Sequence, residues 1–250
     1  MNQREAVIKV MTENGGYATL AYLYQHVFDI PKVSWNSKTP YASIRRIVQD
    51  SKYFFKIKPG LWALKSEKNK IEEKFNLSKV DEPHKEDKQN LETFTHSFYQ
   101  GLIVEIGNIK GYDTYVPQQD KNKYFLEKKL KSITKINELP RFTYENVLRY
   151  FSTIDILWIN QRGFPTNAFE IEHTTNFNNS LLKFTECQDF NISFTIVSSK
   201  NRKKEFQDKI KRDAFKSIYD RVKFFDYEIV AKFHENAHKL DEIEKKFKLN

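Results

Sequence analysis

Residues 154–175 read IDILWINQRGFPTNAFEIEHTT and predict two β-strands joined by a turn. The first strand is the apolar run 154–159, and the second ends in Phe169-Glu170-Ile171-Glu172. The segment 160–165 between them contains Asn, Gly and Pro, which are residue types that favour turns. We therefore expect the two strands to lie side by side in one sheet.

These two strands carry three acidic side chains. Side chains two positions apart in a strand point to the same face, so Glu170 and Glu172 are predicted to project together, with Asp155 beside Glu170. Three converging carboxylates repel one another unless a divalent cation neutralises them, and oxygen ligands suit Mg²⁺ or Mn²⁺. The alternative is a solvated strand face, which is common for acidic residues. Asp155 argues against it, because an unpaired carboxylate inside an apolar run is costly.

The composition indicates a folded, basic protein. The 250 residues are 39% hydrophobic, which is enough for the core of one large domain or two small ones. The net charge of +9 favours a polyanionic partner, and the charge is concentrated in residues 1–66 (+6) and 93–250 (+5). The single cysteine, Cys187, excludes an intramolecular disulfide and a cysteine-cluster zinc site, and we expect it in a core.

The sequence shows no sign of a membrane segment. No apolar run reaches the length of a transmembrane helix. The first residues lack the order of a secretory signal, in which charged residues precede apolar ones. We expect a soluble cytoplasmic protein.

Residues 1–66 predict a winged helix. Apolar spacing indicates helices near 4–14, 19–28 and 41–50, and two strands split by Pro59-Gly60 indicate a β-hairpin over 54–64. Thr39 and Pro40 have the N-cap and first-turn chemistry that begins the third helix. The outward side chains of that helix are expected to be Ser43, Arg45, Arg46 and Gln49.

Several stretches of this unit resemble the HARE helix-turn-helix domain. They are Asn14-Gly15-Gly16-Tyr17-Ala18-Thr19-Leu20, Ser43-Ile44-Arg45-Arg46-Ile47-Val48 and Pro59-Gly60-Leu61-Trp62-Ala63-Leu64. The resemblance implies DNA contact, and we expect it from Lys38, Thr39, Ser43, Arg45 and Arg46. Arginines at such positions can reach phosphates or a guanine edge. The alternative is a winged helix that contacts another protein.

The rest of the chain predicts a charged linker over 67–92 and a second domain over 93–250. Helices are expected at 91–106, 143–150, around 181–184 and at 206–218, followed by a basic C-terminal helix. Strands are expected near 112–117, 154–159, 169–175, 192–196 and 225–229. This order predicts an α/β (α+β mixed) sandwich with a mixed central sheet.

The second domain resembles the PD-(D/E)xK nuclease superfamily, and more specifically a group of type II restriction endonucleases. The resemblance rests on Ile154-Asp155-Ile156-Leu157-Trp158 followed by Phe169-Glu170-Ile171-Glu172-His173-Thr174-Thr175. It implies that Asp155, Glu170 and the Ile171 carbonyl bind the metal, with Glu105 of the leading helix as a further ligand. Glu172 stands where the family usually has lysine. We assign Glu172 a catalytic role first, and keep Lys183 or Lys200 as alternative sources of positive charge.

The resemblance implies a site-specific endonuclease that cuts double-stranded DNA with Mg²⁺, for which Mn²⁺ can substitute. We expect DNA contacts from Lys200, Arg202 and Lys203, a homodimer, and a cognate methyltransferase acting on the same site. The alternatives are a non-catalytic DNA-binding regulator with a decayed nuclease fold, and a repair or RNA nuclease. His173 is expected to form a hydrogen bond in the core rather than to take part in catalysis.

Overall fold

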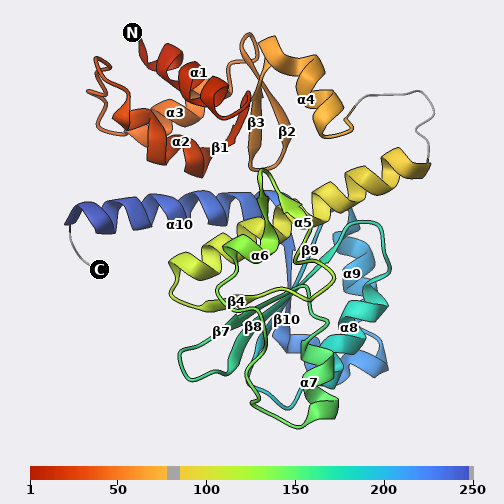
Figure 1. The fold of residues 1–250 in the computed structure, drawn as a ribbon. Helices are drawn as coiled ribbons and strands as arrows, with labels where there is room; N and C mark the ends of the chain where they lie inside the picture. Colours follow the sequence, from red (N-terminus) through yellow and green to blue (C-terminus); the bar gives the residue numbers. More distant parts are fainter. Residues whose placement is uncertain (78–84, 248–250) are drawn as a thin grey trace. The chain divides into compact units, whose positions relative to one another are not determined.

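The computed structural model describes residues 1–77 and 85–247, which form two compact units (Figure 1). The first unit comprises Met1–Leu91 and Ala231–Asn250, and the second comprises Glu92–Val230. The C-terminal segment therefore belongs with the N-terminal unit, whereas the sequence placed it in the second domain. Of the expected linker, residues 78–84 lie outside the described residues, and residues 85–92 are helical.

The first unit contains three helices and a small antiparallel sheet. The helices are α1 (Gln3–Glu13), α2 (Leu20–His26) and α3 (Pro40–Val48), with α4 (Lys68–Lys74) following the sheet. The strands β1 (Tyr17–Thr19), β2 (Phe54–Lys58) and β3 (Leu61–Leu64) pair in the order β1-β3-β2. An Asn2–Glu5 capping box begins α1, and Pro40 occupies the first turn of α3 as expected.

The second unit is built on a mixed five-stranded sheet in the order β10-β9-β8-β7-β4. The strands are β4 (Asp113–Tyr115), β7 (Ile156–Ile159), β8 (Pro165–Glu172), β9 (Ser193–Ser198) and β10 (Val222–Asp226). The β4–β7 and β7–β8 pairs are antiparallel, and the β8–β9 and β9–β10 pairs are parallel. The predicted mixed α/β architecture is confirmed.

Helices lie on both faces of this sheet. The long helix α5 (Lys85–Ile109) packs on the face that carries Trp158, whose indole nitrogen donates to the Ile103 carbonyl. On the other face the sheet shares an apolar core with α8 (Phe177–Glu186) and α9 (Lys203–Ile210). Smaller elements complete the unit: α6 (Leu130–Ile133), α7 (Glu145–Phe151) and a hairpin of β5 (Tyr124–Phe125) and β6 (Lys128–Lys129).

Three local predictions were wrong in detail. The expected strand at 225–229 is β10 followed by α10 (Tyr227–Phe247), because the Asp226 carboxylate caps the Ile229 N–H at 2.9 Å. The expected helix at 206–218 is α9 followed by a 3₁₀ segment, Asp213–Arg221. Asp155 precedes β7 rather than lying inside it.

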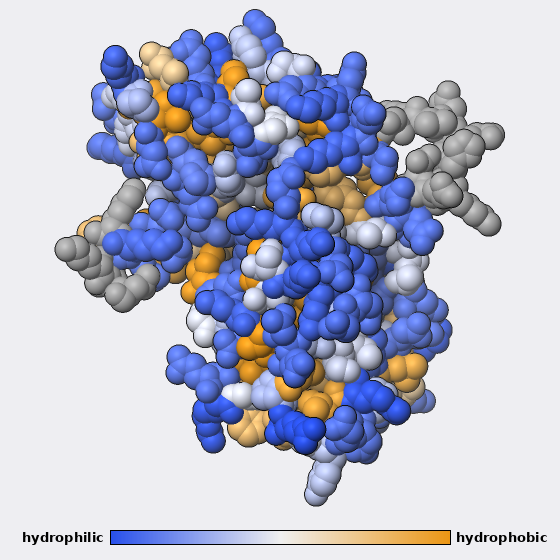
Figure 2. Space-filling model, in the orientation of Figure 1, coloured by the Kyte–Doolittle hydropathy of each residue, from blue (hydrophilic) through white to orange (hydrophobic). Residues whose placement is uncertain are grey.

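No helix among the described residues is long and apolar enough to cross a membrane. The face drawn in Figure 2 is mainly hydrophilic, with apolar residues in small separate groups. Cys187 is fully buried at the end of α8, as expected.

Candidate active site

The end of β8 carries the acidic pair that the strand period predicted. Glu170 and Glu172 both face α8, where the Ser180 hydroxyl donates to both carboxylates, at 2.9 Å to Glu170. Thr175 also donates to Glu172. Phe169 points to the other face and packs its ring 4.8 Å from that of Trp158. The two acids are nearly inaccessible to solvent, at 3% and 6% exposure.

Asp155 lies beside Glu170 because the turn brings β7 against β8. The turn residue Asn160 accepts the Arg162 and Phe164 N–H groups through its side chain. The Ile171 N–H donates to Asp155 Oδ2 at 2.8 Å, and the Asp155 N–H donates to Glu170 Oε1 at 3.2 Å. These reciprocal bonds fix the two carboxylates next to each other.

A lysine from α8 neutralises part of this charge. Lys183 Nζ donates to both oxygens of Glu170, at 2.9 and 3.0 Å, and to the Thr153 carbonyl at 2.9 Å. Lys183 was one of two alternative sources of positive charge in the sequence analysis. Lys200, the other, is exposed at the start of the 3₁₀ segment Lys200–Arg202.

The pKa values of the three acids are raised, chiefly by burial. Burial and the neighbouring Asp155 raise the pKa of Glu170 to about 8, although Lys183 and Ser180 oppose the shift. Burial also raises the pKa values of Asp155 and Glu172. Burial lowers the pKa of Lys183, but Glu170 and Asp155 raise it by more, so this ammonium stays charged.

Two further residues beside Asp155 were missed by the sequence analysis. His96 on α5 places Nε2 3.6 Å from Asp155 Oδ2 and 3.7 Å from Asp120 Oδ2. Asp120 also accepts from Gln100 at 2.7 Å and pairs with Lys123 at 2.5 Å. The available signal was the spacing of His96 and Gln100, two polar residues one helical turn apart on α5.

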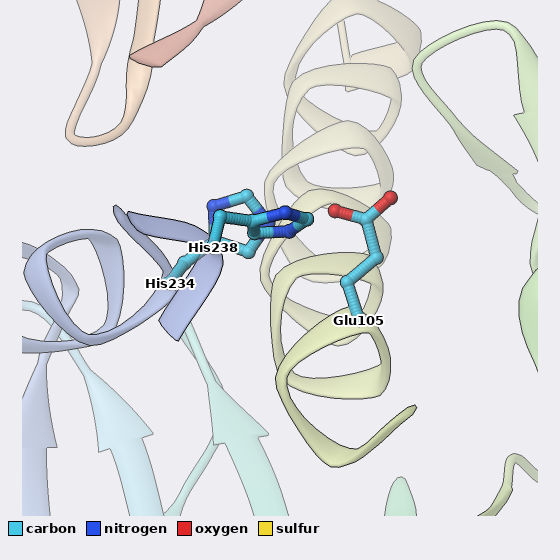
Figure 3. A group of neighbouring side chains, drawn as sticks. All are labelled: Glu105, His234 and His238. Carbon is cyan, nitrogen blue, oxygen red and sulfur yellow. The ribbon is translucent and has the colours of Figure 1, made fainter. Parts of the chain in front are cut away.

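Glu105, the expected further ligand, does not join this group of described residues. It lies nine positions after His96 on α5, which is about two and a half turns, so it faces the opposite side of the helix. Figure 3 shows Glu105 on α5, and His234 and His238 as neighbours on α10. Those two histidine rings have centroids 4.4 Å apart and belong to the first unit.

A cavity of about 170 Å³ opens beside the acidic site. His96, Lys123, Ile171 and His173 line it, together with Glu92, Thr93, Thr174 and Thr175. His173 Nδ1 lies 3.0 Å from the Tyr227 hydroxyl, consistent with the expected hydrogen bond. None of the three acids lines this cavity, but two of its lining residues are direct neighbours of Asp155: Ile171 donates to it, and His96 lies 3.6 Å from it.

The expected DNA-binding residues of the first unit differ in availability. Lys38, Thr39 and Arg46 are exposed, and Ser43 is half-buried. Arg45 forms an ion pair with Glu235 of α10, and Glu235 also accepts from the Tyr24 hydroxyl at 2.5 Å. Arg45 is therefore held by the chain itself, which the sequence analysis did not predict.

Arg202 is likewise committed within the protein. Its guanidinium donates to the carbonyls of Glu172, His173 and Thr175 and pairs with Glu205. It also lies over the Phe177 ring, 4.2 Å from the centroid. Arg202 thus positions the end of β8 rather than standing free for DNA, whereas Lys200 and Lys203 are exposed.

Buried acids at the end of a sheet strand, a lysine against them and a cavity at their edge define a candidate hydrolytic active site in an α/β fold. Residues 77–248 match the family of the type II restriction enzyme NmeDI C-terminal domain, and the chain belongs to this family. Membership implies a type II deoxyribonuclease, with DNA as its binding partner. No curated protein and no solved structure matches the chain.

Proposed function

We propose that the chain is a type II restriction endonuclease that hydrolyses double-stranded DNA at a specific site, with a metal centre of the PD-(D/E)xK type. The observation that carries the proposal is the pair of backbone hydrogen bonds that holds Asp155 and Glu170 together: the Ile171 N–H donates to the Asp155 carboxylate, and the Asp155 N–H donates to the Glu170 carboxylate. This pairing holds two buried carboxylates together beside Ile171, which lines the cavity of about 170 Å³.

The residues present fit Mg²⁺, with Mn²⁺ as a substitute. Asp155 and Glu170 supply carboxylate oxygens, and the Ile171 carbonyl supplies a third oxygen, which matches the preference of these ions. Burial raises the pKa values of both acids, and the neighbouring Asp155 helps to raise that of Glu170 to about 8, so a bound cation would favour the ionised form of Glu170 at neutral pH. When bound, the ion lowers the pKa of a coordinated water and stabilises charge on the phosphate.

The chain's own groups bind and orient the reactants. Lys183 holds Glu170 in place and keeps a positive charge in the site. Glu172, fixed by Ser180 and Thr175, stands where the family usually has lysine, and we assign it to positioning the attacking water. Arg202 fixes the backbone that carries Glu172, and Lys123 faces the cavity where a phosphate would enter.

We further propose that the first unit is a winged helix of the HARE type that contacts the DNA. Its three helices and β1-β3-β2 sheet support this assignment. Lys38, Thr39, Ser43 and Arg46 lie on or before α3 and are at least partly accessible. Lys200 and Lys203 would add phosphate contacts from the second unit. A homodimer and a methyltransferase for the same site complete the proposed system.

A second candidate function is a DNA-binding regulator without cleavage. It is favoured by Glu172 at the lysine position and by the closed ion pair of Lys183 and Glu170, which could be purely structural. The two candidates differ in a single property, which is cleavage.

The test is digestion of a DNA library with the full chain in Mg²⁺, followed by sequencing of the ends. We expect cuts at one short sequence, none in excess chelator, and none with Asp155→Asn. Asp113→Asn is the matched control, because Asp113 is an exposed acid of the same sheet. Cleavage in chelator, or by Asp155→Asn, would refute the metal centre. Binding without cleavage would support the regulator.

A further inference from the structure

A second cluster of possible metal ligands contains a histidine, unlike the acidic site. It consists of His96, Asp120 and Asp155. One donor atom from each side chain lies within 4.8 Å of the others. The cluster combines an imidazole with two carboxylates and draws on three separate parts of the second unit: α5, the loop after β4 and the residue before β7. Asp120 and Asp155 are both buried, and the cavity gives access through His96.

Two polar atoms at this cluster lack hydrogen-bond partners among the described residues. His96 Nε2 is buried and lies 3.6–3.7 Å from the two carboxylates, which is too far for a hydrogen bond. Oε1 of Gln100, a side chain with no exposed surface, is also unpaired. The amide of Gln100 bonds to two residues of the cluster, since its Nε2 donates to the Asp120 carboxylate oxygen Oδ2 and to the backbone carbonyl of Asp155. Unpaired buried polar atoms are costly and call for an explanation.

We propose that His96, Asp120 and Asp155 bind a second divalent cation of the Mn²⁺ class. An imidazole ligand favours a transition ion over Mg²⁺, which prefers oxygen alone. Lys123 occupies Asp120 Oδ1, so Oδ2 is the oxygen directed to His96. The site shares Asp155 with the proposed catalytic centre, and a role in cleavage rests on that proposed function; cation binding itself does not.

The competing arrangement is an ion pair without metal, in which protonated His96 lies between the two acids. Burial lowers the pKa of His96, whereas Asp155 and Asp120 raise it by more. Either a bound cation or a protonated His96 would neutralise the two carboxylates. The two arrangements therefore differ in whether the imidazole nitrogen coordinates a cation.

Electron spin echo envelope modulation of Mn²⁺ added to the full-length protein tests this directly. The ¹⁴N coupling of a coordinated imidazole is expected in the wild type and should disappear in His96→Gln. His173→Gln is the matched control, because His173 lines the same cavity but is bound to Tyr227. It should keep the coupling. Asp120→Asn should weaken Mn²⁺ binding at this site by at least about tenfold, the loss expected when a charged ligand is removed.

The outcomes separate this inference from the proposed function. Glu170→Gln should keep the ¹⁴N coupling, because Glu170 is not a member of the cluster. A wild type without the coupling at saturating Mn²⁺, or a His96→Gln variant that retains it, would overturn the second site even if Mg²⁺-dependent cleavage is found. Conversely, the coupling with no cleavage would support the site and count against the endonuclease. Circular dichroism establishes that each variant is folded.

Discussion

Glu170 ties the stability of the second unit to pH. Its pKa is raised from 4.5 to about 8 by burial and by Asp155, so between these values the folded state holds a proton that the unfolded state has released. Stability is therefore full below pH 4.5 and falls as the pH rises through 8. In chelator, we expect urea unfolding to show a loss of roughly 1–3 kcal/mol between pH 5.5 and 8.5.

Glu170→Gln should flatten much of this pH dependence, because the neutral amide has no charge to bury. Asp155 and Glu172 shift in the same direction and would leave a smaller residual slope. Glu138→Gln, at an exposed position, serves as the control and should behave as the wild type does. A wild type that is more stable at pH 8.5 than at pH 5.5 would contradict the prediction.

Glu172 and Lys183 can be assigned separate roles by substitution. Glu172→Lys introduces the lysine that the proposed PD-(D/E)xK assignment would expect, but it places a second ammonium near Lys183 and removes the acceptor of Ser180 and Thr175. We expect a loss of cleavage of about 10²–10⁴-fold, the scale of one oriented catalytic group. Plasmid cleavage rates at saturating Mg²⁺ measure it.

Lys183→Met is expected to cost cleavage on the same scale, whereas Lys216→Met should change it little, because Lys216 is exposed and lies outside both the acidic site and the proposed DNA contacts. If Glu172→Lys cleaves as well as the wild type, then the role given to Glu172 is wrong and Lys is the better residue there. If Lys183→Met alone is silent, the ion pair with Glu170 is structural.

At the level of elements, α5 approaches the sheet closely at Gly107. A Cβ atom there would lie 2.5 Å from Trp158 Nε1 and 2.6 Å from the Thr114 Cγ2 atom. Gly107→Ala is therefore expected to destabilise the protein by about 1–3 kcal/mol, the usual cost of overpacking. Thr93→Ala at an exposed position of the same helix is the control.

Trp158→Phe should partly rescue Gly107→Ala, because it removes the atom that the new methyl group meets. A double-mutant cycle by urea denaturation measures the coupling, which we expect to exceed about 0.5 kcal/mol for residues in contact. Additive effects of the two substitutions would show that the helix shifts away from the sheet instead.

In the first unit, two adjacent arginines of α3 differ in whether they contact α10. Arg45 pairs with the largely buried Glu235, and Arg46 is exposed. We expect Arg46→Ala to weaken DNA binding, by 1–3 kcal/mol if the side chain reads a base. Arg45→Ala should chiefly lower thermal stability, since it leaves the Glu235 charge unpaired. Fluorescence anisotropy and thermal melts separate the two effects. Equal losses of affinity in both variants would show that Glu235 releases Arg45 on binding.

The sequence predicted those parts of the site that depend on local geometry. Strand period placed Glu170 and Glu172 together, and a short hairpin placed Asp155 beside them. His96 and Asp120 reach Asp155 only through tertiary packing, so no local pattern connects them to it. Arg45 pairs with Glu235, which is far away in the sequence, and Arg202 bonds to backbone carbonyls. A sequence pattern of apolar and polar residues predicts neither contact. Tyr227 fits a strand or a helix equally well, and the Asp226 cap decides between them.

At the scale of the whole molecule, the family match does not include the most basic part of the chain. The family match begins at residue 77, so it covers the acidic site but not the first three helices or the β1-β3-β2 sheet. Residues 1–66 nevertheless carry a charge of +6, more than the second domain as first delimited. Affinity for DNA is therefore expected to draw on both units and to fall steeply with salt.

The number of active sites per assembly decides how both strands are cut. The described residues of one chain form one proposed catalytic site, which contains Asp155 and Glu170. Cutting both DNA strands therefore requires two chains or two successive nicks. In a dimer, wild-type protein mixed with an excess of Asp155→Asn forms mixed pairs with one working site. We expect such mixtures to convert supercoiled plasmid mainly to nicked circles, whereas the wild type alone gives linear DNA. Mixing with an excess of Asp113→Asn, which leaves the site intact, should still give linear DNA. Linear product that falls only in proportion to the dilution of wild-type chains, with no accumulation of nicked circles, would show that each chain acts alone.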